Sequence, residues 1–270
     1  MSTSGELQSG FLIGVKYLSF CKLMYVMGFF DSANINLLLQ RSGEMNKKIL
    51  MGFVAASVAL ALSGCKIDMG ASIPLSGLLG SELKTGSADL YVEVPACNSY
   101  EDSRQPSKGL IDAKNEIAQI IPESEFKECF QKKFNSFASF SVPIAYGPAN
   151  KVTDSTSQIR VLRDTEKNFA YVAFGQKLKQ SLEQARKKPS IAGGFSPSDV
   201  SFSLNVENDT DKTITANFVG VFIGQDPVIV ANGIELGAGK GLPLTLSNVT
   251  TAVLFSSYPN ASAWFMDGMK

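Results

Sequence analysis

The residues that could support chemistry in this 270-residue chain are few, because it contains four cysteines and no histidine. Without histidine the chain cannot form a Ser-His-Asp triad, a Cys-His pair or a histidine-ligated zinc site. An enzyme of this sequence would have to use carboxylates, lysine, tyrosine or serine. We therefore expect no catalytic residue, no metal site and no cofactor, with carboxylate-dependent catalysis as the alternative.

Two short motifs are similar to known sites but fail on spacing. The glycine-rich stretch 237–241 contains Lys240, but a phosphate-binding loop would need glycine in place of Ile234 and serine or threonine in place of Gly241. Ser81 and Lys84 have the spacing found in penicillin-interacting serine enzymes, but the Lys-Thr-Gly element starts at Lys84 itself instead of far downstream. We interpret the first motif as a glycine-rich β-turn and assign the second no catalytic role.

Residues 45–65 show three features of a secretory leader at the required spacing. Lys47 and Lys48 give a basic start, residues 49–62 form an apolar run, and small residues precede Cys65. The run is shorter than the ~20 residues that a spanning helix needs. Residues 62–65, Leu-Ser-Gly-Cys, resemble the lipobox of bacterial lipoproteins. The resemblance implies that the chain is cut before Cys65 and that Cys65 carries acyl chains, such as palmitate, which hold the protein in a membrane.

This resemblance also implies the limits and location of the mature protein. Because a signal peptide acts from the N-terminus, we interpret residues 45–64 as the signal peptide and residues 1–44 as an extension upstream of the true start. In enterobacterial lipoproteins an Asp after the lipidated cysteine retains the protein in the inner membrane. Lys66 occupies that place here, which implies a lipid anchor in the outer membrane of the cell envelope, facing the periplasm.

The two other cysteines of the mature chain, Cys97 and Cys129, are expected to form a disulfide, because exported thiols usually pair. The alternatives are two buried free thiols or a redox site, although the C-x-x-C spacing of redox sites is absent.

Hydrophobic periodicity predicts an α+β fold, with a mixed strand and helix N-terminal half and an antiparallel β-sandwich or meander C-terminal half. Residues 65–86 are expected to be a flexible tether, 87–188 an α+β region and 199–270 an antiparallel β region. We expect helices at 107–121, with Ser107 as N-cap, at 124–134 and at 176–188. The expected strands are 89–94, 139–146, 159–162, 169–174, 200–206, 214–223, 228–230, 234–236, 242–246 and 251–255.

The overall layout, a lipobox followed by one cysteine pair, resembles enterobacterial lipoproteins of uncharacterised function. We expect a non-catalytic binding or assembly module in the periplasm, anchored through Cys65 and bound to another envelope protein. A carboxylate-dependent envelope hydrolase and a binder of a small ligand or lipid are the alternatives. Five of the 25 basic and three of the 25 acidic residues precede Cys65, which leaves 20 and 22. This balance gives no electrostatic basis for nucleic-acid binding.

Overall fold

A computed structural model of the chain describes residues 66–187, 197–256 and 261–269. The chain divides into the units Met1–Leu62 and Ser63–Lys270, and every described residue lies in the second unit. The predicted upstream extension, the signal peptide, Cys65 and most of the link between the two predicted regions therefore lie outside the described residues.

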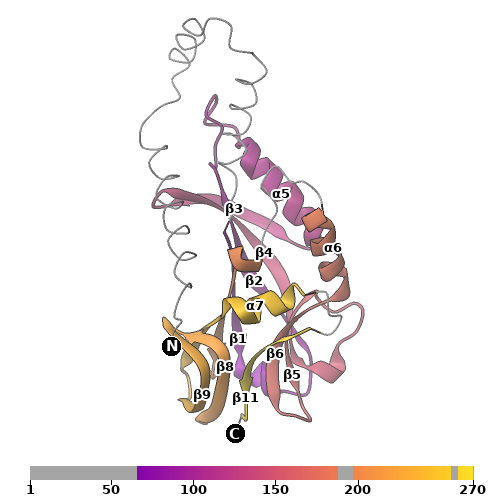
Figure 1. The fold of residues 1–270 in the computed structure, drawn as a ribbon, viewed down its shortest axis with the longest axis vertical. Coiled ribbons are helices and arrows are strands. Elements are labelled where there is room, and N and C mark those ends of the chain that lie inside the picture. The colour runs from indigo at the N-terminus through magenta and orange to yellow at the C-terminus, as the bar shows by residue number, and fades with distance from the viewer. Residues whose placement is uncertain (1–65, 188–196, 257–260, 270) are drawn as a thin grey trace, which may run out of the picture. The chain divides into compact units, whose positions relative to one another are not determined.

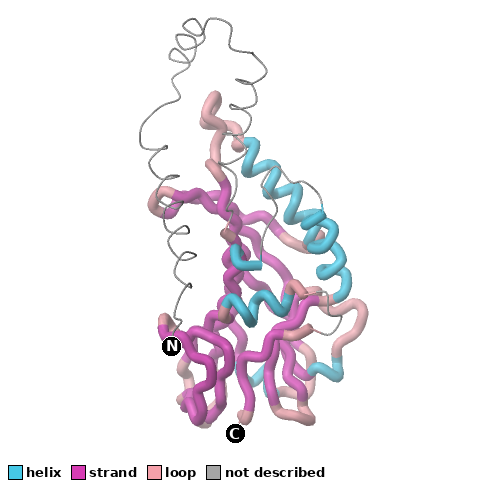
Figure 2. Tube along the Cα trace, in the orientation of Figure 1, coloured by secondary structure: helices cyan, strands magenta, loops and turns pink. Residues whose placement is uncertain are grey.

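The described residues form strands and a few short helices (Figures 1 and 2). The strands are β1 (Ile67–Pro74), β2 (Lys84–Val94), β3 (Glu125–Lys132), β4 (Asn135–Pro148), β5 (Ile159–Asp164), β6 (Phe169–Phe174), β7 (Val200–Glu207), β8 (Ile214–Ile223), β9 (Asp226–Leu236), β10 (Gly241–Leu246) and β11 (Ala263–Asp267). The α-helices are α4 (Leu75–Leu79), α5 (Lys108–Ile120), α6 (Gln176–Lys187) and α7 (Asn248–Leu254), and the 3₁₀ turns are η1 (Ala149–Lys151) and η2 (Pro197–Asp199).

Nine of these strands close into a barrel. The hydrogen-bonded order runs β10-β7-β1-β2-β4-β5-β6-β11-β8 and returns to β10, which pairs with both β7 and β8. Two pairs, β1 with β7 and β4 with β5, are parallel, and the other pairs of the ring are antiparallel. Strand β3 adds to β4 and strand β9 adds to β8 outside the ring. Because the ring is closed, the free strand edges of the described sheet lie on the two added strands, β3 and β9.

Alternating apolar residues place one continuous core on the inner side of this sheet. Met69 of β1 lies opposite Leu90 on one side and Phe202 on the other, and Leu90 lies opposite Phe140. All four side chains are buried. Because side chains alternate between the two faces of a strand, matching registers gather the apolar positions on one face.

Helix α4 packs onto the barrel directly after β1. Its residues Leu75 and Leu78 are buried, and a Cβ on Gly77 would come 2.5 Å from the Tyr146 ring. Gly147 has a φ of +135°, and a Cβ there would come 2.8 Å from the Glu82 carbonyl oxygen. Two glycines thus permit the close approach of this segment to β4.

Helices α5 and α6 pack on each other outside the barrel (Figure 2). The predicted N-cap of α5 is confirmed, because the Ser107 hydroxyl oxygen accepts a hydrogen bond from the backbone N–H of Leu110 at 3.0 Å. The same hydroxyl donates to the Ala96 carbonyl, which ties the start of α5 to the chain that leaves β2.

The predicted fold class is wrong. The described residues are 50% strand and 22% helix, and they form a closed nine-stranded barrel instead of an α+β half followed by a sandwich or meander. The parallel pairs explain the difference. Strand β1 pairs with β7, from the region predicted to be separate, so the two predicted regions share one sheet and one core.

Three local predictions fail for identifiable reasons. The predicted tether contains β1, α4 and the start of β2, because the alternating residues Met69, Ala71 and Ile73 are buried in the core. The predicted helix 124–134 is strand β3. The predicted strand 251–255 falls in α7, where the Ser247 hydroxyl caps the helix by accepting from the Thr250 N–H.

Candidate functional site

The disulfide predicted between Cys97 and Cys129 is present, with a Cα–Cα distance of 5.6 Å. Cys97 follows β2 and Cys129 lies within β3, so the bond joins the loop before α5 to the added strand. The backbone N–H of Ser107 donates to the Cys97 carbonyl at 3.0 Å, which closes the loop 97–107 at its base.

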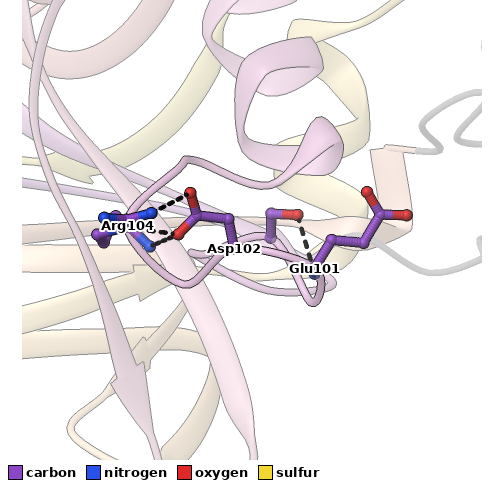
Figure 3. Close-up of polar contacts among 4 residues, drawn as sticks. Glu101, Asp102 and Arg104 are labelled. Carbon is purple, nitrogen blue, oxygen red and sulfur yellow. Dashed lines mark hydrogen bonds and ion pairs between the residues drawn. The ribbon is translucent and has the colours of Figure 1, made fainter.

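This loop is polar and is held by its own contacts (Figure 3). The Arg104 side chain and backbone both donate to the Asp102 carboxylate, and these hydrogen bonds lower the pKa of Asp102. The backbone N–H of Glu101 donates to the Ser99 hydroxyl. Beside them, Tyr100 is fully exposed. The arrangement shapes the loop without creating a reactive group.

We call β3 together with residues 91–94 of β2 and 135–141 of β4 the flap. Its outer face carries an aromatic cluster, in which the Phe130 ring lies 5.9 Å from both Tyr91 and Phe137. On the opposite face Phe126 contacts Phe140 at 5.6 Å, and the ammonium of Lys114 on α5 lies 4.2 Å from the Phe126 ring. The flap therefore presents aromatic side chains on both faces.

The turn between β3 and β4 carries the sequence Lys132-Lys133-Phe134, which we call the hairpin tip. Phe134 is 99% exposed and lies in a turn, where the sequence predicted the last residue of a helix. Lys133 has a φ of +58°, which turns the chain sharply at this point. Neither lysine forms an ion pair with a described residue. The hairpin tip is thus an exposed aromatic ring beside two cations.

A second exposed apolar surface lies along β9. This strand pairs only with β8, so its other edge meets no strand in the described part of the chain. Ile229 is 87% exposed and Val230 is 56% exposed. An exposed strand edge with large apolar side chains is the feature through which a further strand can add to a sheet.

The described carboxylates whose pKa values are displaced are all stabilised in the charged form. Three carboxylates have displaced pKa values, and all three are lowered: Asp102 by Arg104, Glu125 by a hydrogen bond from Lys127, and Asp209 by hydrogen bonds from Ser76 that outweigh its partial burial. They lie in the loop 97–107, at the start of β3 and in the turn after β7. A general acid needs a raised pKa, so these groups do not provide one.

The remaining motifs have structural roles or lie apart. Residues 237–240 form the turn between β9 and β10, where the Lys240 N–H donates to the Gly237 carbonyl at 3.1 Å, as the β-turn interpretation predicted. Lys84 is the exposed first residue of β2. Within the described ranges no group of three metal-binding side chains gathers. No described helix has the length and apolar character needed to cross a membrane.

Fold and surfaces together define a class: a closed β-barrel domain with a disulfide-linked flap and helices packed around it. More particularly, the chain belongs to the family described as a domain of unknown function, DUF7424, which matches residues 72–267. The match begins within β1 and ends with β11, so the family domain is the barrel itself. No curated protein and no solved structure matched the chain.

Sequence reasoning located the cysteine pair but missed both exposed apolar surfaces. The hairpin tip had only a weak signal, because Lys132 and Lys133 favour a helix as readily as a turn and only the following Asn135 is a typical turn residue. The β9 edge had none, since its continuous apolar run Val228–Ala231 is also typical of a strand that is buried and paired on both sides.

Proposed function

We propose that this protein is a lipid-anchored cell-envelope protein whose barrel is a non-catalytic module for binding another envelope protein. The observation that carries the binding role is the open edge of β9 with exposed Ile229 and Val230. The anchor is supported by the lipobox-like residues 62–65. The disulfide fits a chain exported to an oxidising compartment.

We propose that the partner contributes a β-strand that pairs along β9. Nine strands are already satisfied within the ring, whereas β9 extends the sheet beyond it and keeps unpaired backbone groups along one edge. Main-chain hydrogen bonds would provide affinity, and the exposed side chains of Ile229 and Val230 would add apolar contact on the two faces of the strand. The lowered carboxylate pKa values give no comparable support to the hydrolase alternative.

The anchor is tested by the intact mass of the protein purified from membranes of its native host. We expect a chain that begins at Cys65, carries added acyl mass, and gains the mass of two hydrogen atoms when a reductant reduces the disulfide. A chain that retains residues 1–64 without acyl mass would contradict the proposed anchor.

The binding edge is tested by placing a photo-reactive phenylalanine at Ile229 and, as a matched control, at Val249 on α7, which is 79% exposed but lies on no sheet edge. In intact cells we expect one discrete adduct from position 229 that disappears when Val230 is changed to Lys, because a charge on the edge opposes strand addition. Equal adducts from both positions, or none from 229, would refute the edge as the binding site. An adduct of twice the chain mass would show that the partner at this edge is a second copy of the same chain and not another protein.

A further inference from the structure

The first described residue of the barrel is tied to the flap. The Glu93 N–H donates to the Lys66 carbonyl at 2.9 Å, and the strand β1 begins at the next residue, Ile67. In the sequence, Lys66 directly follows Cys65, and consecutive Cα atoms are only about 3.8 Å apart. Acyl chains on Cys65 would therefore hold the barrel directly at the membrane, with no tether to separate them.

The same strand register brings the hairpin tip to this part of the barrel. Glu93, the partner of Lys66, lies opposite Phe137 on β4, and Val94 lies opposite Ser136. Phe134 precedes Phe137 by three residues, toward the turn, which is about 10 Å along a strand. Because β1 and β2 are antiparallel, β1 followed backward from Ile67 to Lys66 runs in the direction in which β2 runs toward Val94. Because β2 and β4 are also antiparallel, the hairpin tip projects in this same direction.

The hairpin tip has the chemistry of a membrane-interface contact. Phe134 places a whole ring in solvent, and Lys132 and Lys133 beside it are exposed cations without an ion-pair partner among the described residues. A ring at headgroup depth loses its unfavourable contact with water, while each lysine near an anionic surface contributes about 1 kcal/mol of attraction. Tyr100, fully exposed in the loop that leaves the same end of β2, is a second aromatic side chain of this kind.

We propose that the hairpin tip, with Phe134 between the headgroups and Lys132 and Lys133 on their phosphates, docks on the anionic phospholipid bilayer that holds the acyl chains of Cys65. This inference rests on the proposed lipid anchor. The two contacts together would fix the orientation of the barrel, which one flexible attachment could not do. Figure 1 shows β9 at the end of the barrel away from β3, so the partner-binding edge would face away from the membrane.

The test uses the full chain made in its native host, with acylation verified by intact mass and the protein reconstituted into vesicles of phosphatidylethanolamine and phosphatidylglycerol. The reporter is Phe134→Trp combined with Trp264→Phe, which leaves one tryptophan, at the hairpin tip. The control is the unchanged protein, whose single tryptophan, Trp264 on β11, is 49% exposed. Vesicles containing doxyl-labelled lipid measure how close each tryptophan lies to the acyl region.

We expect a blue shift and a loss of most emission for the position 134 reporter and no change for Trp264. Adding Lys132→Glu and Lys133→Glu should reduce the quenching at position 134. Vesicles made of phosphatidylcholine alone, which carry no net charge, should reduce the quenching of the reporter protein that keeps both lysines. Acylated protein whose position 134 reporter keeps its aqueous emission would overturn the docking and leave the anchor intact. Equal quenching of both tryptophans would overturn the orientation. Protein without acyl mass would overturn the anchor, and the docking with it.

Discussion

Removing the disulfide between Cys97 and Cys129 should lower the free energy of unfolding of the barrel. The expected loss depends on the number of residues between the two cysteines. The bond closes a loop with a separation of 32 residues. In the chain-entropy treatment, a loop of this length stabilises the folded state by about 3–4 kcal/mol, because it restricts the unfolded chain. For a domain of this size that corresponds to a fall in Tm of about 10 °C. The enclosed loop contains the whole of α5, so the order of that helix also depends on the bond.

The assay is urea unfolding of the residue 66–270 fragment, which contains all the described strands, followed by circular dichroism. The double variant Cys97→Ala with Cys129→Ala avoids leaving a half-buried free thiol, and the unchanged fragment under reductant is its matched control. Both should lose the same free energy of unfolding. A loss below about 1 kcal/mol in both would refute the reasoning, because it would mean that the unfolded chain is not restricted by the bond.

Three further predictions concern stability, each measured as the free energy of unfolding of the same fragment. Ser107→Ala should cost about 1 kcal/mol by removing the N-cap of α5, and Ser107→Asn, which can also cap, should recover much of it. Gly147→Ala should cost at least about 2 kcal/mol, because its φ of +135° strains any side chain; Gly70→Ala, with no atom within 4 Å of the added Cβ, is the control, and equal losses would contradict this. Burial raises the pKa of Asp209, but hydrogen bonds from Ser76 lower it by a larger amount, so the pKa in the folded state lies below the ordinary value of 3.8. The charged carboxylate therefore stabilises the fold at pH values above 3.8. The stability difference between the unchanged fragment and Asp209→Asn should therefore stay constant down to about pH 5 and shrink as the pH falls below 3.8 through the lower folded pKa; a constant difference there would contradict the assignment.

The local pattern of the sequence predicted many elements correctly, because alternation and capping are short-range properties. Strands β5, β6, β8 and β10, the second half of β2 and helices α5 and α6 lie where periodicity placed them. The cysteine pairing followed from the number of thiols left after Cys65 and is confirmed.

Strand β3 shows how the same pattern can mislead. Phe126 and Phe130 are four residues apart, which places them on one face of a helix and equally on one face of a regular strand. A register shift after Phe126 moves them to opposite faces, where Phe126 packs on Phe140 and Phe130 stacks on Phe137. A bulge of this kind is stabilised by contacts with β4, so residues 125–132 alone do not specify it.

The sequence by itself predicted the pairing of Cys97 with Cys129, which is confirmed, and determined most of the apolar positions that became the core. Only the tertiary structure decided which strands are neighbours, because the parallel pairs β1 with β7 and β4 with β5 join segments through backbone hydrogen bonds that carry no residue-specific signal. It likewise decided exposure. Phe134 and Ile229 have the same apolar character as the buried phenylalanines and isoleucines, and only the place of β3 and β9 outside the closed ring leaves them in solvent.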